Sequence, residues 1–208
     1  MKKSTLLTSL TTGLALACAL SLSACGGSDE EEIVISMRLA GVTKDGLKIT
    51  NMGGTPVDVP PGTGFAFPRR VPVDSDYDIK VVAQPPNTDP DSCKVFEGKG
   101  NTGSINPQFI VIACIVTTFP LGGSVLGLTG GELVINNGSQ SVTIPKNATA
   151  FSMTPVGAAN PKLGQVAEGT PYGLTILKQP ASGTCTIANP AGIMPAAAVN
   201  NIVISCTP

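Results

Sequence analysis

One nine-residue run occurs twice in the chain and decides the fold. It reads Tyr77-Asp78-Ile79-Lys80-Val81-Val82-Ala83-Gln84-Pro85 in the first copy and Tyr172-Gly173-Leu174-Thr175-Ile176-Leu177-Lys178-Gln179-Pro180 in the second. In the first copy Tyr77, Ile79 and Val81 alternate with more polar neighbours, and this period of two indicates a β-strand with one buried face. Clusters of Gly, Pro, Asn and Asp separate this run from similar short runs and predict turns between them. We therefore predict an all-β protein.

The repetition extends to both sides of the run. Matched residues stand 86 positions apart before it, and they are Gly41, Leu47, Ile49 and Asn51 with Gly127, Leu133, Ile135 and Asn137. After it, residues 109–114 match residues 201–206. The same order at shifting offsets indicates duplication of a unit of about 85–90 residues. About seven short strands in a unit of this size favour a two-sheet sandwich of immunoglobulin-like type. We expect the first repeat at 33–118 and the second at 119–208.

The cysteines follow the same repeat. The chain has six, which are Cys18, Cys25, Cys93, Cys114, Cys185 and Cys206. The last four make an even set in an exported chain, which is typical of a disulfide framework. Four cysteines allow three pairings, and a common separation of 21 residues within each repeat favours Cys93 with Cys114 and Cys185 with Cys206.

The N-terminus has the parts of a secretory signal peptide. Met1-Lys2-Lys3 is a short basic start, an apolar stretch runs from about Leu6 to Leu22, and small residues precede Cys25. The motif Leu22-Ser23-Ala24-Cys25 resembles the lipobox of bacterial lipoproteins. The resemblance implies cleavage after residue 24 and attachment of acyl chains, palmitate among them, to Cys25.

The residues after Cys25 concern where the protein is anchored. Position 26 is Gly, not Asp, and in lipoproteins this implies sorting to the outer membrane of a Gram-negative cell. Which face of that membrane carries the protein, periplasmic or cell-surface, stays open. Residues 25–32 form the lipidated end and an acidic tether, in which Asp29-Glu30-Glu31-Glu32 is typical of a solvated, flexible spacer.

The repeat also resembles bacterial extracytoplasmic modules of uncharacterised function. The shared features are the start Gly127-Leu128-Thr129-Gly130, the pair Asn136-Asn137, the run from Tyr172 to Pro180, and the closing cysteines Cys185 and Cys206. The resemblance covers most of residues 36–207 and carries no catalytic residue to this chain.

Composition argues against several classes of function. The chain has no histidine, which excludes Ser-His and Cys-His catalytic pairs and His-ligated metal sites. A formal net charge of −1 argues against a nucleic-acid partner. The stretch Gly122-Gly123-Ser124-Val125-Leu126 lacks the final glycine of a hydrolase nucleophile motif. We expect no enzyme activity, no cofactor and no metal.

One acidic segment invites comparison with calcium-binding loops. Asp74-Ser75-Asp76-Tyr77-Asp78 places carboxylates at alternate positions, as such loops do. Ile79 and Pro85 stand where an EF-hand loop needs Gly and Glu. We therefore expect a solvated turn that leads into a strand.

The second repeat carries an insertion that could bind a partner. Phe65 and Tyr77 are 12 residues apart, whereas Phe151 and Tyr172 are 21 apart, so nine extra residues fall within Thr154–Pro171. We predict an interaction loop whose candidate residues are Lys162, Leu163, Val166 and Glu168, with the two apolar ones contacting a protein. The alternative is length variation without function, which surface loops tolerate.

These observations favour a membrane-anchored lipoprotein of the cell envelope with a non-catalytic structural or protein-interaction role. The expected partners are the membrane, through the lipid on Cys25, and an envelope protein, with no nucleic acid. The alternative is a module that binds envelope glycan or another small ligand. The lack of tryptophan and the presence of only two tyrosines weigh against a glycan site, because aromatic faces are the usual platform for sugars.

The anchor is testable by one substitution. Cys25→Ser is expected to give soluble or unprocessed protein, because the acyl chains supply nearly all of the membrane affinity. Fractionation of cells that express the variant measures this. Retention of the variant in the outer membrane to the same extent as the parent protein would refute the lipobox interpretation.

Overall fold

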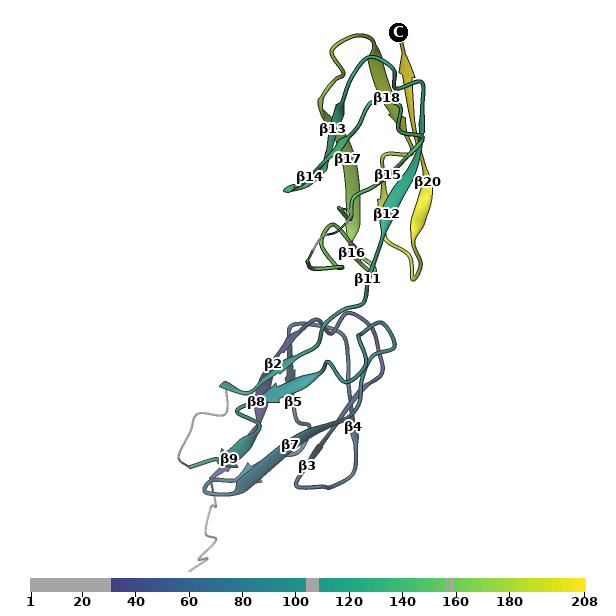
Figure 1. The fold of residues 1–208 in the computed structure, drawn as a ribbon. Coiled ribbons are helices and arrows are strands. Elements are labelled where there is room, and N and C mark those ends of the chain that lie inside the picture. The colour runs from purple at the N-terminus through teal and green to yellow at the C-terminus, as the bar shows by residue number, and fades with distance from the viewer. Residues whose placement is uncertain (1–30, 104–108, 156, 158) are drawn as a thin grey trace, which may run out of the picture. The chain divides into compact units, whose positions relative to one another are not determined.

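The computed structural model describes residues 31–103, 109–155, 157 and 159–208. The predicted signal peptide, Cys25 and the tether up to residue 30 lie outside this range. The last two residues of the predicted flexible tether are part of the fold instead: Glu32 pairs with Pro72, and the Glu31 carbonyl accepts a hydrogen bond from the Val73 N–H. In the described part of the chain the secondary structure is almost entirely β, in strands β1–β20 (Figure 1). No helix that is long and apolar enough to span a membrane occurs among these residues.

The first repeat contains two four-stranded sheets, ordered β5-β2-β10-β8 and β4-β3-β7-β9, and the short pair β1-β6. Its strands are β1 (Glu32–Ile33), β2 (Ser36–Ala40), β3 (Leu47–Asn51), β4 (Val57–Val59), β5 (Gly64–Ala66), β6 (Val71–Pro72), β7 (Asp76–Ala83), β8 (Lys94–Phe96), β9 (Lys99–Asn101) and β10 (Val111–Ala113).

The second repeat has the same arrangement, with sheets β15-β12-β20-β18 and β14-β13-β17-β19 and the pair β11-β16. Its strands are β11 (Thr118–Phe119), β12 (Leu121–Leu126), β13 (Leu133–Asn137), β14 (Gln140–Ile144), β15 (Ala150–Ser152), β16 (Val166–Ala167), β17 (Pro171–Lys178), β18 (Thr184–Ala188), β19 (Ala191–Ile193) and β20 (Val199–Thr207).

The predicted fold class, two immunoglobulin-like sandwich units, is therefore confirmed. The expected count of about seven strands per unit was too low, because the described residues form ten in each. The additional strands include the two-residue pairs β1-β6 and β11-β16. Two residues are too short a run for hydrophobic alternation to reveal.

The strand registers show that the duplication holds at the level of individual residue pairs. β3 and β7 pair Ile49 with Val81, and β13 and β17 pair Ile135 with Ile176. A register shift directly precedes Ile49 and, equally, Ile135. The parallel pairs also match, because β2 lies beside β10 as β12 lies beside β20. Two repeats of low mutual similarity thus build the same ladders.

The polar residues that the two copies share brace these ladders. The side-chain oxygen of Asn51 accepts a hydrogen bond from the backbone N–H of Asp78, and Asn137 does the same for Gly173. The Gln179 side chain makes two hydrogen bonds to the backbone of Cys185: its Oε1 accepts from the N–H and its Nε2 donates to the carbonyl. These shared residues therefore have structural roles.

The two tyrosines are placed alike. Tyr77 lies opposite Gly100 and Tyr172 lies opposite Gly192 in neighbouring strands, and each phenol ring covers its glycine. Tyr77 donates a hydrogen bond to the carbonyl of Glu97. Burial, with a smaller contribution from the Glu97 carboxylate, raises the pKa of Tyr77 above its ordinary value. The hydroxyl therefore stays protonated and remains a donor at neutral pH.

Each sandwich has its own core between its two sheets. In the first repeat Leu47, Ile49 and Ile112 are fully buried, and in the second Leu133, Ile135 and Ile204 are their counterparts. Both disulfides border these cores. Cys93–Cys114 and Cys185–Cys206 have Cα–Cα distances of 4.0 and 3.9 Å, and the predicted pairing is confirmed.

A glycine near the disulfide is required in each repeat. Gly41 and Gly127 have φ angles of 72° and 73°, in the left-handed region. A Cβ on Gly41 would lie 2.0 Å from the Cys114 carbonyl oxygen, and one on Gly127 would lie 2.4 Å from that of Cys206. The first glycine of the Gly-Leu-Thr-Gly start, which the first repeat keeps as Gly41, is thus needed where the chain passes directly beside a cystine.

Two substitutions separate the energetic cost of a steric clash with the Cys206 carbonyl from the cost of a positive φ. Gly127→Ala is expected to lower the free energy of unfolding by at least about 2 kcal/mol more than Gly138→Ala. Gly138 also has a positive φ, 56°, but a Cβ added there would have no other atom within 4 Å. Denaturant unfolding of both variants measures the difference. Equal destabilisation would show that contact with the Cys206 carbonyl does not restrict this position.

Candidate functional site

The structure locates the insertion of the second repeat. Met153 donates its N–H to Leu121, as Phe67 does to Ile35, and the chain returns to the common fold at β16. The nine extra residues therefore lie within 154–165. Their described part is ordered by local hydrogen bonds, in which Asn160 accepts from the N–H of both Lys162 and Leu163.

Two of the four predicted loop residues are not free surface contacts. Val166 is 8% exposed and belongs to the core of the second repeat, so the prediction that it contacts a partner was wrong. The reason is that Val166 begins β16 and pairs with Phe119, the place that Val71 holds opposite Ile33. Glu168 is also buried, its carboxylate is ion-paired with Lys44, and it lies outside the insertion.

The other two residues lie within the insertion. Lys162 is ion-paired with Asp89, so its charge is already matched inside the chain. Leu163 is 39% exposed and is the one predicted contact residue that presents apolar surface. Of the four predicted contact residues, Leu163 alone therefore remains a candidate for contact with a partner.

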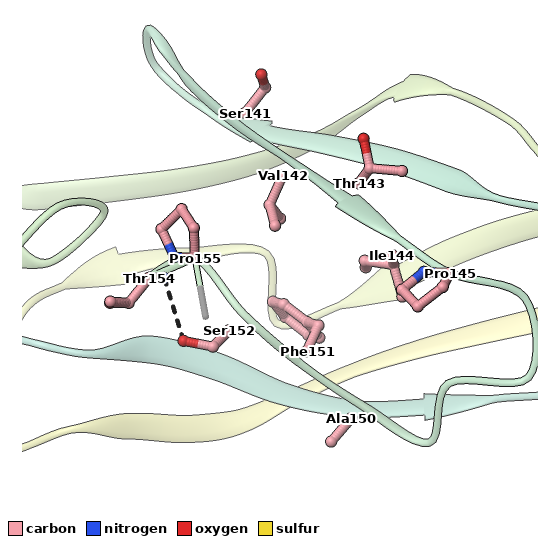
Figure 2. A pocket seen from close by; sticks show the side chains of 10 residues that line it. All are labelled: Ser141, Val142, Thr143, Ile144, Pro145, Ala150, Phe151, Ser152, Thr154 and Pro155. Atoms are coloured by element: carbon pink, nitrogen blue, oxygen red, sulfur yellow. Dashed lines mark hydrogen bonds between the residues drawn. The ribbon is translucent and has the colours of Figure 1, made fainter. Parts of the chain in front are cut away.

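A groove opens where the insertion leaves β15. It lies between β14 and β15, which are edge strands of the two different sheets, and has a volume of about 450 Å³. Figure 2 shows Val142 and Phe151 directed into the space between the strands, whereas Ser141 and Thr143 point away from it. Thr154 and Pro155, the first residues of the insertion, complete one wall.

The chemistry of the groove is neutral. None of the ten described residues that line it is charged. The Thr154 N–H donates to the Ser152 hydroxyl at 3.1 Å, as the dashed line in Figure 2 marks. The Thr154 hydroxyl is buried and has no hydrogen-bond partner among the described residues, although such groups are normally satisfied. The groove thus combines apolar walls with one unused polar group.

The first repeat has a groove that overlaps the matching place but is not lined by β5, and its chemistry is different. Its volume is about 470 Å³, and Val57 on β4 lines it as Val142 on β14 lines the other. Arg69 occupies the position that corresponds to Pro155. On the outer side of β4, Asp58 is ion-paired with Lys48 at 2.6 Å, whereas the matching pair in the second repeat is Thr143 with Val134.

The acidic segment behaves as the predicted turn. The Asn101 side-chain amide donates to the Asp74 carbonyl and to the Asp76 carboxylate, and these two hydrogen bonds hold the turn against β9. Across the described residues, no group of three or more Cys, Asp or Glu side chains is placed to hold a metal ion.

Sequence reasoning did not find the groove, because hydrophobic alternation shows which side chains face inward but not which strands lie at an edge. One signal was present: residues 140–144 contain no charge, whereas the matching strand of the first repeat contains Asp58. Edge strands usually carry such charges as protection against pairing with other chains.

Comparison with known proteins gives a likeness of fold only. No protein-family model and no curated protein matches the chain. Among solved structures, a B repeat unit of the collagen-binding surface protein of Staphylococcus aureus is 11% identical, with 85% of this chain and 98% of that chain covered and a TM-score of 0.26.

Two further solved structures are comparably distant. A C-terminal fragment of the pilus adhesin SpaC of Lactobacillus rhamnosus GG is 9% identical, covers 84% of this chain and 98% of its own, and has a TM-score of 0.35. The Bacillus anthracis TIE protein is 12% identical over 84% of this chain, with a TM-score of 0.37, and only 34% of its length is matched. These similarities are too low to indicate what this chain binds.

The corrected interpretation of the insertion predicts a large loss of stability on substitution of Val166 and almost none on substitution of Leu163. Val166→Asp is expected to lower the free energy of unfolding by about 3 kcal/mol or more, because it buries an unpaired carboxylate in the core. Leu163→Asp, at an exposed position, is expected to change it by no more than about 0.5 kcal/mol. Thermal or urea unfolding measures both. Similar small effects would place Val166 on the surface, as the sequence alone predicts.

Proposed function

We propose that this protein is a lipid-anchored lipoprotein of the bacterial outer membrane, and that its two β-sandwich repeats have a non-catalytic, protein-interaction role. The lipobox-like Leu22-Ser23-Ala24-Cys25 supports the anchor. The roles of the shared residues support a non-catalytic scaffold, since Asn137, Gln179 and the cystines are engaged in holding strands together. A duplicated frame of this kind positions surfaces for binding.

The observation that carries the interaction role is the neutral groove between β14 and β15. Edge strands present unpaired backbone N–H and C=O groups, and proteins normally protect them with charge. β14 lacks the charge that Asp58 supplies to β4, and the groove next to it is apolar. Such an edge accepts an extended peptide as an additional strand, with the groove taking alternate side chains.

The buried Thr154 hydroxyl supports a polar contact at one end of the same groove. An unpaired buried hydroxyl costs about 1–3 kcal/mol, and an incoming backbone group would recover this by hydrogen bonding. We therefore infer an occupant that is extended, largely uncharged and able to hydrogen-bond through its backbone. A segment of another envelope protein has these properties.

The second candidate is a small ligand or envelope glycan in the same groove. A volume of about 450 Å³ falls within the range of small-molecule sites, and the Thr154 hydroxyl would orient such a ligand. Phe151, the aromatic residue of the lining, is buried and offers little ring surface for stacking against a sugar. The groove lies between the edge strands β14 and β15, and an edge strand favours a protein partner that adds a strand over a small ligand.

The addition of a partner strand to β14 is testable with a substitution in β14 and a matched control substitution in β18, an edge strand of the other sheet. A photoreactive residue at position 141 of β14 is expected to crosslink a discrete protein in intact cells. In that background Thr143→Asp is expected to lower the yield at least about fivefold, because it gives β14 a charge that an added strand would partly desolvate. Thr186→Asp, the same change in edge strand β18, should leave the yield unchanged.

Two results would contradict the proposal. One is an adduct that forms equally with Thr143→Asp, provided that circular dichroism shows both variants folded. The other is the lack of any protein adduct at position 141. An adduct that resists protease but is released by glycan hydrolases would favour the small-ligand alternative.

A further inference from the structure

The outer face of sheet β5-β2-β10-β8 in the first repeat has a composition that the fold does not require. Six side chains on the solvent side of β2, β10 and β8 define what we call the cationic face: Arg38, Ala40, Lys94, Phe96, Val111 and Ala113. Cross-strand register places Phe96 beside Val111 and Val111 beside Arg38. In the next row Ala113 lies between Lys94 and Ala40.

This face is both positive and apolar. Arg38 and Lys94 are exposed, and none of the six described residues of the face is acidic. Phe96 is 56% exposed, and Phe109, two residues before β10, is 65% exposed. Large aromatic side chains at such exposure lose favourable burial, so their presence beside two cations indicates a contact surface.

The second repeat shows which residues on this face the fold requires, because it builds the same sheet with other residues. By the same strand registers, Ser124 takes the place of Arg38, Thr186 that of Lys94 and Ala188 that of Phe96. The corresponding face of the second repeat is uncharged at these positions. Since both repeats fold alike, the cations and the phenylalanine of the first repeat are not needed to build the sheet.

The first repeat is also the one next to the lipid. Cys25 and Arg38 are 13 residues apart, so even a fully extended chain keeps Arg38 within about 45 Å of the anchoring point. A basic face held so close to a membrane meets anionic headgroups at high effective concentration. The acidic residues of the tether are repelled by the same anionic membrane surface.

We propose that the cationic face docks on the anionic, phosphate-bearing headgroups of the membrane that holds the lipid anchor. The inference rests on the proposed lipid anchoring. Arg38 and Lys94 bind headgroup phosphates, and Phe96 enters the interface between headgroups and acyl chains. Each cation contributes about a fivefold preference for the docked state, so the two together contribute about thirtyfold. The docked first repeat leaves the second repeat as the part that carries the partner groove.

The chain has no tryptophan, so a single introduced one reports its own position. The test uses the full lipidated protein with Phe96→Trp, inserted through its acyl chains into vesicles with brominated acyl chains. Vesicles of phosphatidylcholine alone are compared with vesicles that contain about one third phosphatidylglycerol. The matched control is Ala188→Trp, at the corresponding position of the second repeat.

Docking predicts that the fluorescence of the Phe96→Trp variant is quenched in the anionic vesicles and that the fluorescence of the Ala188→Trp variant is not. Addition of about 0.5 M salt should reduce the quenching, because it screens the headgroup charge. Arg38→Ser with Lys94→Thr, the residues that the second repeat has, should lower the ratio of docked to undocked protein about thirtyfold. These replacements keep the fold because they already occur in the same sheet of the second repeat.

The outcomes separate this inference from the proposed function. Protein that floats with vesicles but shows equal quenching at positions 96 and 188 refutes docking and leaves the anchor intact. Quenching at position 96 that is the same in neutral and anionic vesicles also overturns the proposed role of the cations. Protein that does not float refutes the anchor, and the docking proposal fails with it.

Discussion

In each repeat the cystine is the constraint on which the other shared features converge. Cys185 and Cys206 lie directly opposite each other in β18 and β20, and β20 is also the parallel neighbour of β12. Gln179 clasps the backbone of Cys185, and Gly127 must be glycine because the Cys206 carbonyl lies against it. A crosslink across about 20 residues is worth about 3 kcal/mol in the chain-entropy model. A core with few aromatic residues benefits from such a crosslink.

Much of this frame could be predicted from the sequence. The alternation in the run that begins at Tyr77 identified inward-facing residues, and the equal spacing of the cysteines identified their partners. Both signals work because they reflect constraints along the chain. The groove depends instead on which strands end a sheet, and Val166 was misassigned because a two-residue strand has no periodicity.

The two repeats differ mainly where the frame leaves residues free. Inward positions and the Asn, Gln and Tyr braces are held in common, since each is tied to a hydrogen bond or to packing. Outward positions vary: Arg38 and Phe96 in one copy correspond to Ser124 and Ala188 in the other. The residues that the copies share are thus structural, and we propose that the residues that differ bind the membrane in the first repeat and a partner in the second.

Each repeat is a sandwich closed by its own cystine, because each bridge joins two cysteines of the same repeat. Digestion of the oxidised protein without reduction, followed by mass spectrometry of the linked peptides, measures this pairing. The account predicts two linked pairs, Cys93 with Cys114 and Cys185 with Cys206. A peptide pair that joins Cys93 or Cys114 to Cys185 or Cys206 would contradict it, because one bridge would then connect the two repeats.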